Sequence, residues 1–171
     1  MVDRWDSREP GVKTDLVVNM AETPSPWKMT PSIDYLRIIH GHELLVRTMR
    51  GDLETHDLRF LRGNTPLLQF SGFSPSFDTK LGITVDASEN FVFSGGGDKS
   101  LRIWSLRTGQ ALPVRNEATE ARVIDGRGVA KMMTCCIRAL EIVESDSEVM
   151  LWMAFENCLD KVILGPKGLL L

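Results

Sequence analysis

The glycine run 95–97, followed by Asp98, Lys99 and Ser100, is the stretch of this chain that comes nearest to phosphate-binding chemistry. In a P-loop a glycine precedes the lysine, backbone N–H groups wrap the phosphate, and a helix follows. Here the carboxylate of Asp98 stands before Lys99 and would repel phosphate. The following residues, 101–106, alternate in the manner of a β-strand. We therefore predict a hairpin, in which strand 91–93 enters, residues 95–98 turn, and strand 101–106 returns.

The histidines are the other residues with ligand chemistry. His40 and His42 would share one face of a strand and could bind a metal, but Glu43 would point to the other face and nothing nearby completes the site. The chain contains no G-x-S-x-G motif and no convincing carboxylate pair, since the acidic stretch 144–148 fits a solvated turn. The sequence therefore predicts no catalytic residue, no metal site and no cofactor, and we expect a protein that is not an enzyme.

Composition narrows the class of protein further. The chain has 171 residues, of which 43% are hydrophobic and 25% charged, with a formal net charge of -3, as expected for a globular domain without bulk attraction to nucleic acid. Its three cysteines include no C-x-x-C pair, which favours a reducing compartment. No apolar run approaches the roughly 18 residues of a membrane span, and no signal-peptide core is visible. We expect an intracellular protein, cytoplasmic or nuclear, that binds neither membrane, nucleic acid nor a small-molecule substrate.

Three short segments that end alike divide the chain into repeats. These segments are Trp5-Asp6-Ser7-Arg8, His56-Asp57-Leu58-Arg59 and Trp104-Ser105-Leu106-Arg107. Their first residues lie 51 and then 48 positions apart, and short strand patterns precede the second and third. A period near 50 without a long helical pattern predicts repeated antiparallel sheets in one domain. The expected boundaries are a remnant over about 1–20, repeats over about 33–72, 80–114 and 135–165, and an irregular excursion over about 115–131.

Residues 81–112, "LGITVDASENFVFSGGGDKSLRIWSLRTGQAL", closely resemble a repeat of the WD-repeat family. In that family, blades of four antiparallel strands stack around an axis into a β-propeller. The resemblance places Ser94 at the strand-b hydroxyl, Asp98 at the tight-turn aspartate and Trp104 at the strand-c tryptophan of a buried hydrogen-bond network. The family's histidine is missing, because Gly72-Phe73 stands where a Gly-His pair is expected. The remaining members are therefore expected to use water or backbone partners.

The resemblance implies an incomplete ring. Closed propellers typically have 4 to 8 blades, and a period near 50 allows this chain about three. We therefore expect an all-β, partial WD-repeat β-propeller of about three four-stranded antiparallel blades, with the ring not closed. Such a fold is expected to act as a non-catalytic protein-interaction scaffold that presents its rim surfaces to partner proteins.

A narrower function is implied by the first repeat ending. Trp5, Asp6 and Arg8 resemble the tryptophan-aspartate-any-arginine box of WD-repeat substrate receptors, which dock on the propeller-shaped adaptor of cullin-type ubiquitin ligases. Arg59 and Arg107 close the other two repeats, where a guanidinium can pair with a partner carboxylate. These five residues are the candidate partner-binding positions. The general scaffold and the substrate receptor both remain open as readings of the sequence.

Overall fold

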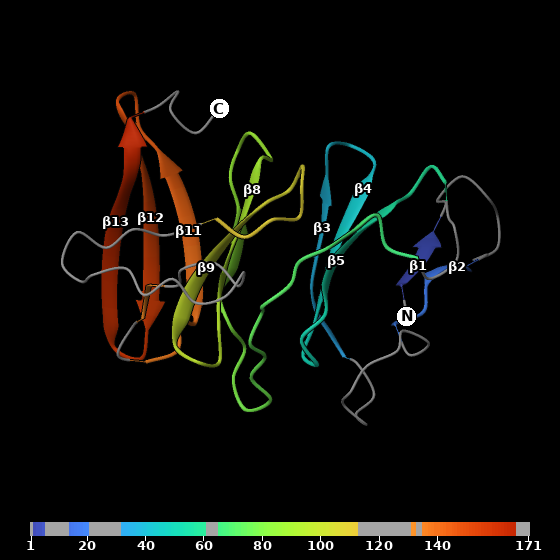
Figure 1. Cartoon of the computed structure of the whole chain (residues 1–171), viewed down its shortest axis with the longest axis horizontal. Coiled ribbons are helices and arrows are strands. Elements are labelled where there is room, and N and C mark those ends of the chain that lie inside the picture. The colour runs from blue at the N-terminus through green and yellow to red at the C-terminus, as the bar shows by residue number, and fades with distance from the viewer. Residues whose placement is uncertain are drawn as a thin grey trace. The chain divides into compact units, whose positions relative to one another are not determined.

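The computed structural model describes residues 2–5, 14–20, 32–60, 65–112, 131–132 and 135–166. These residues form antiparallel β-sheets and no α-helix, so the all-β prediction is confirmed. Within the described ranges, no helix is long and apolar enough to cross a membrane. The chain divides into two compact units, Met1–Gln69 and Phe70–Leu171, and Figure 1 labels most of their strands.

The first unit contains a two-stranded and a four-stranded sheet. Its strands are β1 (Val2–Trp5), β2 (Thr14–Val18), β3 (Ile33–Ile39), β4 (Glu43–Thr48), β5 (Leu53–Asp57) and β6 (Leu68–Gln69). In the larger sheet, β3-β4-β5-β6, each strand pairs antiparallel with the next along the chain. Leu44 and Val46 of β4 pack with Val18 and Met20 in a buried cluster. The apolar side chains of this central strand therefore help to anchor the sheet.

The second unit contains a four-stranded sheet, β10-β9-β8-β7, and a three-stranded sheet, β11-β12-β13. Its strands are β7 (Ile83–Val85), β8 (Phe91–Gly95), β9 (Ser100–Ser105), β10 (Lys131–Met132), β11 (Ala139–Glu144), β12 (Glu148–Phe155) and β13 (Cys158–Pro166). Val92 of β8 lies opposite Trp104 of β9 in an antiparallel register, so the predicted hairpin around the glycine turn is confirmed. Three sheets of blade size thus occur among the described residues, although the last has three strands where four were expected.

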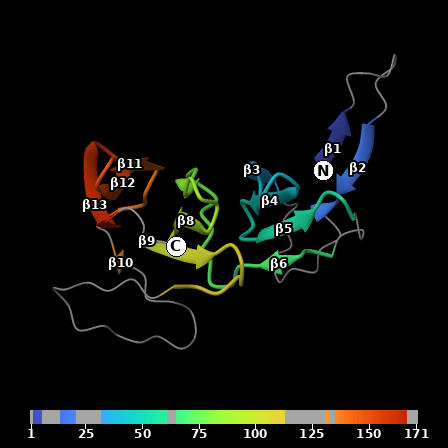
Figure 2. The same ribbon diagram turned by 90° about the horizontal axis from the view of Figure 1, so that it is seen from above.

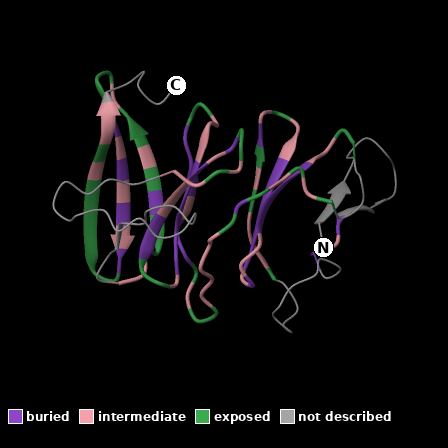
Figure 3. Cartoon of the chain, viewed as in Figure 1, coloured by how far each residue is buried: buried purple, intermediate pink, exposed green. Residues whose placement is uncertain are grey.

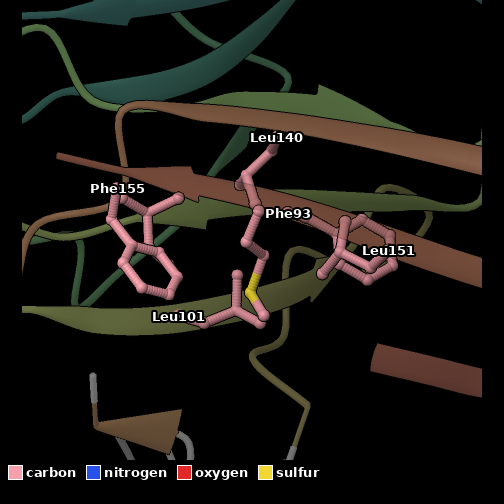
Figure 4. Close-up of a cluster of buried hydrophobic side chains, with 7 residues drawn as sticks. Phe93, Leu101, Leu140, Leu151 and Phe155 are labelled. Atoms are coloured by element: carbon pink, nitrogen blue, oxygen red, sulfur yellow. The ribbon is translucent and has the colours of Figure 1, made fainter. Parts of the chain in front are cut away.

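A hydrophobic cluster joins the two sheets of the second unit (Figure 4). Phe93 and Leu101 belong to the β7–β10 sheet, and Leu140, Leu151 and Phe155 belong to the β11–β13 sheet. Strict alternation makes this possible, because every second residue of a strand points to the same face. Burying one such side chain fully contributes about 1.5–3 kcal/mol, so this cluster is a main source of stability for the unit.

The outer strand beside β9 is assembled from two separate stretches of chain. In the first stretch, Ala111 makes an isolated bridge to Trp104, and Leu112 N–H donates to the Ile103 carbonyl at 2.8 Å. An uninterrupted strand in this register would place residue 114 opposite Leu101. Lys131, from a later part of the chain, occupies that place instead, and β10 pairs with β9 there (Figure 2).

The turn after β4 and the turn after β8 occupy equivalent positions in successive repeats. Gly51 N–H donates to the Thr48 carbonyl at 3.1 Å, and Lys99 N–H donates to the Gly96 carbonyl at 3.0 Å. Gly51 has φ 113° and Lys99 has φ 63°, both in the left-handed region. Non-glycine residues rarely adopt such angles, yet Lys99 adopts one at the place where the other turn has a glycine. Two different sequences therefore build closely similar turns. The repeat expected from the sequence is therefore visible in the backbone.

Candidate functional site

The first candidate arginine, Arg59, lies in the turn that follows β5. Its backbone N–H donates to Oδ1 of Asp57, the last residue of β5, at 2.9 Å. Its guanidinium Nε and Nη2 donate to the same carboxylate at 3.1 and 2.9 Å. These hydrogen bonds, above all those of the side chain, lower the pKa of Asp57 to about 2. The Arg59 side chain is nevertheless 56% exposed, so much of it still faces solvent.

An exposed aromatic ring extends this corner. Phe60 is 64% exposed, and the Arg59 Cζ atom lies 5.7 Å from its ring centroid, within the range of a cation–π contact. Leu67, at the start of the return toward β6, is also exposed. Aromatic and arginine side chains are enriched at protein-binding surfaces. Phe60 is thus a candidate binding residue that the sequence analysis missed. The sequence did contain one indication of it, because Phe60 directly follows the repeat ending at Arg59.

The second candidate arginine, Arg107, lies in the equivalent turn after β9. Its backbone N–H donates to Oγ of Ser105, the last residue of β9, at 3.3 Å, and its Nε donates to Oδ1 of Asn90 at 3.1 Å. Within the described part of the chain, no carboxylate forms an ion pair with Arg107. Its side chain is exposed, and the group that it binds is a neutral amide oxygen.

The two arginine corners are one backbone motif that occurs in two successive repeats. In the first, Leu58 N–H donates to the His42 carbonyl at 2.8 Å; in the second, Leu106 N–H donates to the Asn90 carbonyl at 2.7 Å. Each bond ties the turn to the end of the neighbouring hairpin in its own sheet. Each arginine therefore lies two residues beyond the end of a strand. The backbone hydrogen bonds of the turn hold in place the Cα atom from which the side chain extends.

The two neighbouring histidines lie differently from the sequence expectation. His40 and His42 are in the turn between β3 and β4, and His40 has φ 49°. As a result, Nδ1 of His40 and Nε2 of His42 lie 3.2 and 3.8 Å from Oε1 of Glu43. The expectation that Glu43 points away from them was wrong, because a turn replaces strand alternation here. No group of three His, Cys, Asp or Glu residues that could hold a metal ion occurs in the described ranges.

Ser94 and Asp98, two of the three predicted network residues, bond to residues of their own sheet and its turns. Ser94 is fully buried, and its Oγ lies 3.1 Å from the Gly95 carbonyl and 3.5 Å from the Gly82 carbonyl, to both of which it can donate. Asp98 lies in the turn and accepts hydrogen bonds from Arg102 Nη1 at 2.9 Å and Ser100 N at 3.3 Å. Burial raises the pKa of Asp98, but the hydrogen bonds from Arg102 and Ser100 outweigh this effect. The net pKa of Asp98 lies below its ordinary value.

Trp104, the third predicted network residue, bonds to a more distant part of the chain. It is fully buried, and its Nε1–H donates to the Ser71 carbonyl at 2.9 Å. The Phe70 ring packs against it edge-on, with centroids 6.4 Å apart. The structure therefore brings Trp104, Ser94 and Asp98 onto one hairpin and directs these hydrogen bonds to different partners.

The first unit contains two polar side-chain pairs that the sequence did not reveal. Arg47, fully buried, donates Nε and Nη2 to the Asp34 carboxylate at 3.0 and 2.7 Å. His56 and Glu54 are both buried, with Nε2 and Oε1 2.9 Å apart. The only signal was their spacing, because residues two apart on a strand share a face. A polar pair thus stands where the other repeat has its tryptophan.

The remaining candidates cannot be placed. Trp5 ends β1, but its side chain, Asp6 and Arg8 lie outside the described residues. Docking on a ubiquitin-ligase adaptor therefore stays a prediction. Most of the expected excursion 115–131 also lies outside them, and its last residue, Lys131, begins β10.

Comparison with known proteins yields structural likeness alone. No protein-family model and no curated protein matches the chain. Among solved structures, it is similar to the computationally designed Ika4 protein, with a TM-score of 0.51 and 12% identity over 78% of this chain and 66% of that one. It is also similar to the computationally designed Ika8 protein, with a TM-score of 0.49 and 15% identity over 77% of this chain and 33% of that one. The chain thus spans less than two thirds of either designed protein, and at such low identity the first likeness bears on the fold only.

Proposed function

We propose that this chain is a non-catalytic interaction scaffold, a partial WD-repeat β-propeller whose sheet corners present arginine side chains to partner proteins. The observation that carries the proposal is the arginine corner itself, which recurs in two successive repeats with equivalent backbone hydrogen bonds. A rigid sheet that holds solvent-facing side chains at its loops is a common basis for recognition. The resemblance of residues 81–112 to a WD repeat and the sheets of three or four antiparallel strands support the propeller.

The chemistry of the corners favours partners with carboxylates. Arg107 is bonded to a neutral amide, Asn90, and among the described residues no acid pairs with it that an incoming carboxylate would have to displace. Arg59 already holds the carboxylate of Asp57, so a partner would have to share or displace that ion pair. An arginine offers a planar fork that binds a carboxylate in two parallel hydrogen bonds. Arg107 is therefore expected to contribute more to binding an acidic segment than Arg59.

The experiment is quantitative capture of proteins from a cell extract on the immobilised full chain. Arg107→Glu is compared with wild type and with Lys99→Glu, which makes the same charge change on an exposed residue at the other turn of the same strand. Reversal of one interface charge costs several-fold or more in affinity. We expect wild type and Lys99→Glu to capture the same set of acidic proteins. Arg107→Glu should capture at least about fivefold less of them. If Arg107→Glu captures the same proteins in the same amounts as wild type, the corner is not a binding site.

A further inference from the structure

The β11–β13 sheet has a second face, opposite the one that packs in the hydrophobic cluster. The antiparallel registers identify the residues on this face, because directly paired residues point to the same side of a sheet. They form three rows across the sheet: Val143–Met150–Ile163, Glu141–Trp152–Lys161 and Ala139–Ala154–Leu159. We call these nine residues the outer face. None of them belongs to the buried cluster that joins the sheets of this unit.

The outer face is largely apolar and open to solvent. Val143, Ile163 and Leu159 are 40%, 55% and 67% exposed, and Figure 3 shows the exposed stretches along β11 and β13. Trp152, at its centre, is only partly covered, with Lys161 Nζ 5.8 Å from its ring centroid. Isolated exposed apolar residues are ordinary, but a contiguous apolar patch on a sheet face marks an interaction surface.

The charges of the outer face are arranged to complement themselves. In the middle row, Glu141 stands on β11 and Lys161 on β13, one on each side of Trp152. A two-fold axis parallel to β12, between two facing copies, exchanges the positions of the two outer strands. Glu141 of one copy then lies opposite Lys161 of the second copy, and Trp152 lies opposite Trp152. By the same operation, Val143 meets Ile163, and Ala139 meets Leu159.

We propose that the outer face is a dimerisation surface, on which a second copy of this chain packs face to face about a two-fold axis along β12. Closed two-fold interfaces use the same patch on both subunits, and the two-fold operation places opposite charges opposite each other and apolar residues opposite apolar residues. Packed sheets align within about 30° of each other because of their twist, so the rows remain close to their partners near the centre. The inference is independent of the arginine corners, which lie outside this face.

The test measures the mass of the full chain over a range of concentrations by sedimentation or light scattering. Wild type is expected to pass from one copy to two as concentration rises. Glu141→Lys and Lys161→Glu each place like charges opposite one another, so each should weaken the dimer at least about tenfold. The double variant Glu141→Lys/Lys161→Glu restores opposite charges across the axis, so its dissociation constant should return to within about threefold of wild type. Lys99→Glu, outside this face, should leave it unchanged.

Three results would overturn the proposal. A mass of one copy at every concentration would mean that the face does not bind itself. Growth beyond two copies would indicate head-to-tail association, which does not close. A double variant as weak as the single variants would show that Glu141 and Lys161 do not face each other across an axis. Circular dichroism of each variant confirms that the exposed substitutions leave the sheets intact.

Discussion

Asp98 illustrates how one charged side chain holds a tight turn. Its carboxylate accepts from Arg102 and Ser100, and these bonds hold its pKa below the ordinary value in spite of partial burial. The stabilisation is therefore present above the pKa of the unfolded chain and is lost as the pH falls through the lower folded value. Because the turn is partly open to solvent, its size is about 0.5–1 kcal/mol.

Asp98→Asn should lower the free energy of unfolding by about 0.5–1 kcal/mol at pH 7. At a pH below the folded pKa of Asp98 the wild-type carboxyl is itself neutral, so the two proteins should become equally stable. Denaturant unfolding at pH 7 and at a series of lower pH values measures whether the difference in stability disappears as the pH falls. Asp146→Asn, in the exposed turn between β11 and β12, is the control and should change nothing at any of these pH values. A difference that persists unchanged in acid would exclude the ion pair as its cause.

The outer strand beside β9 is split between two separate stretches of the chain. Since Lys131 takes the place of residue 114 opposite Leu101, removing residues 114–130 would join the two stretches in register. We expect this deletion to fold with the strand content of wild type, and with a melting temperature within a few degrees, because a shorter connection costs less closure entropy. Circular dichroism and a thermal melt measure it.

The matched control removes one residue fewer. Deleting 114–129 shifts β10 by one position against β9, and a one-residue slip turns every side chain of a strand to the opposite face. This control should be less stable than the longer deletion by about 1–2 kcal/mol. If the two deletions are equally stable, the pairing of β10 with β9 contributes nothing to the fold.

On the scale of the whole chain, the two units have separate hydrophobic clusters. Val46 belongs to the cluster of the first unit and Ile137 to that of the second, and both are fully buried. Val46→Ala should cost about 2 kcal/mol and Ile137→Val about 1 kcal/mol, from the methyl and methylene groups they remove. The double variant should lose their sum within about 0.5 kcal/mol.

Hydrogen exchange locates these losses. Val46→Ala should speed exchange in β4 and β5 and leave β12 as in wild type, whereas Ile137→Val should do the reverse, because local opening follows the packing of each cluster. Faster exchange throughout the chain in either variant would show that both units open together.

Features set by neighbouring residues could be predicted from the sequence. The hairpin around residues 95–98 followed from alternation and turn chemistry, and the period near 50 followed from three similar endings. The hairpin pattern and each single repeat ending lie within a few residues of chain, where backbone geometry allows few alternatives. The all-β class followed from the same local signals.

Contacts between distant residues could not be predicted in this way. Nothing near Trp104 in the sequence indicates that its Nε1–H bonds the Ser71 carbonyl, or that Lys131 rather than residue 114 lies opposite Leu101. The rows of the outer face likewise depend on the register of three strands. Alternation along a strand assigns a side chain to one of two faces, but it does not say which face is covered. Which face is covered is decided only by the tertiary structure, because the free energy of burial is gained only when a second surface packs against the first and excludes water.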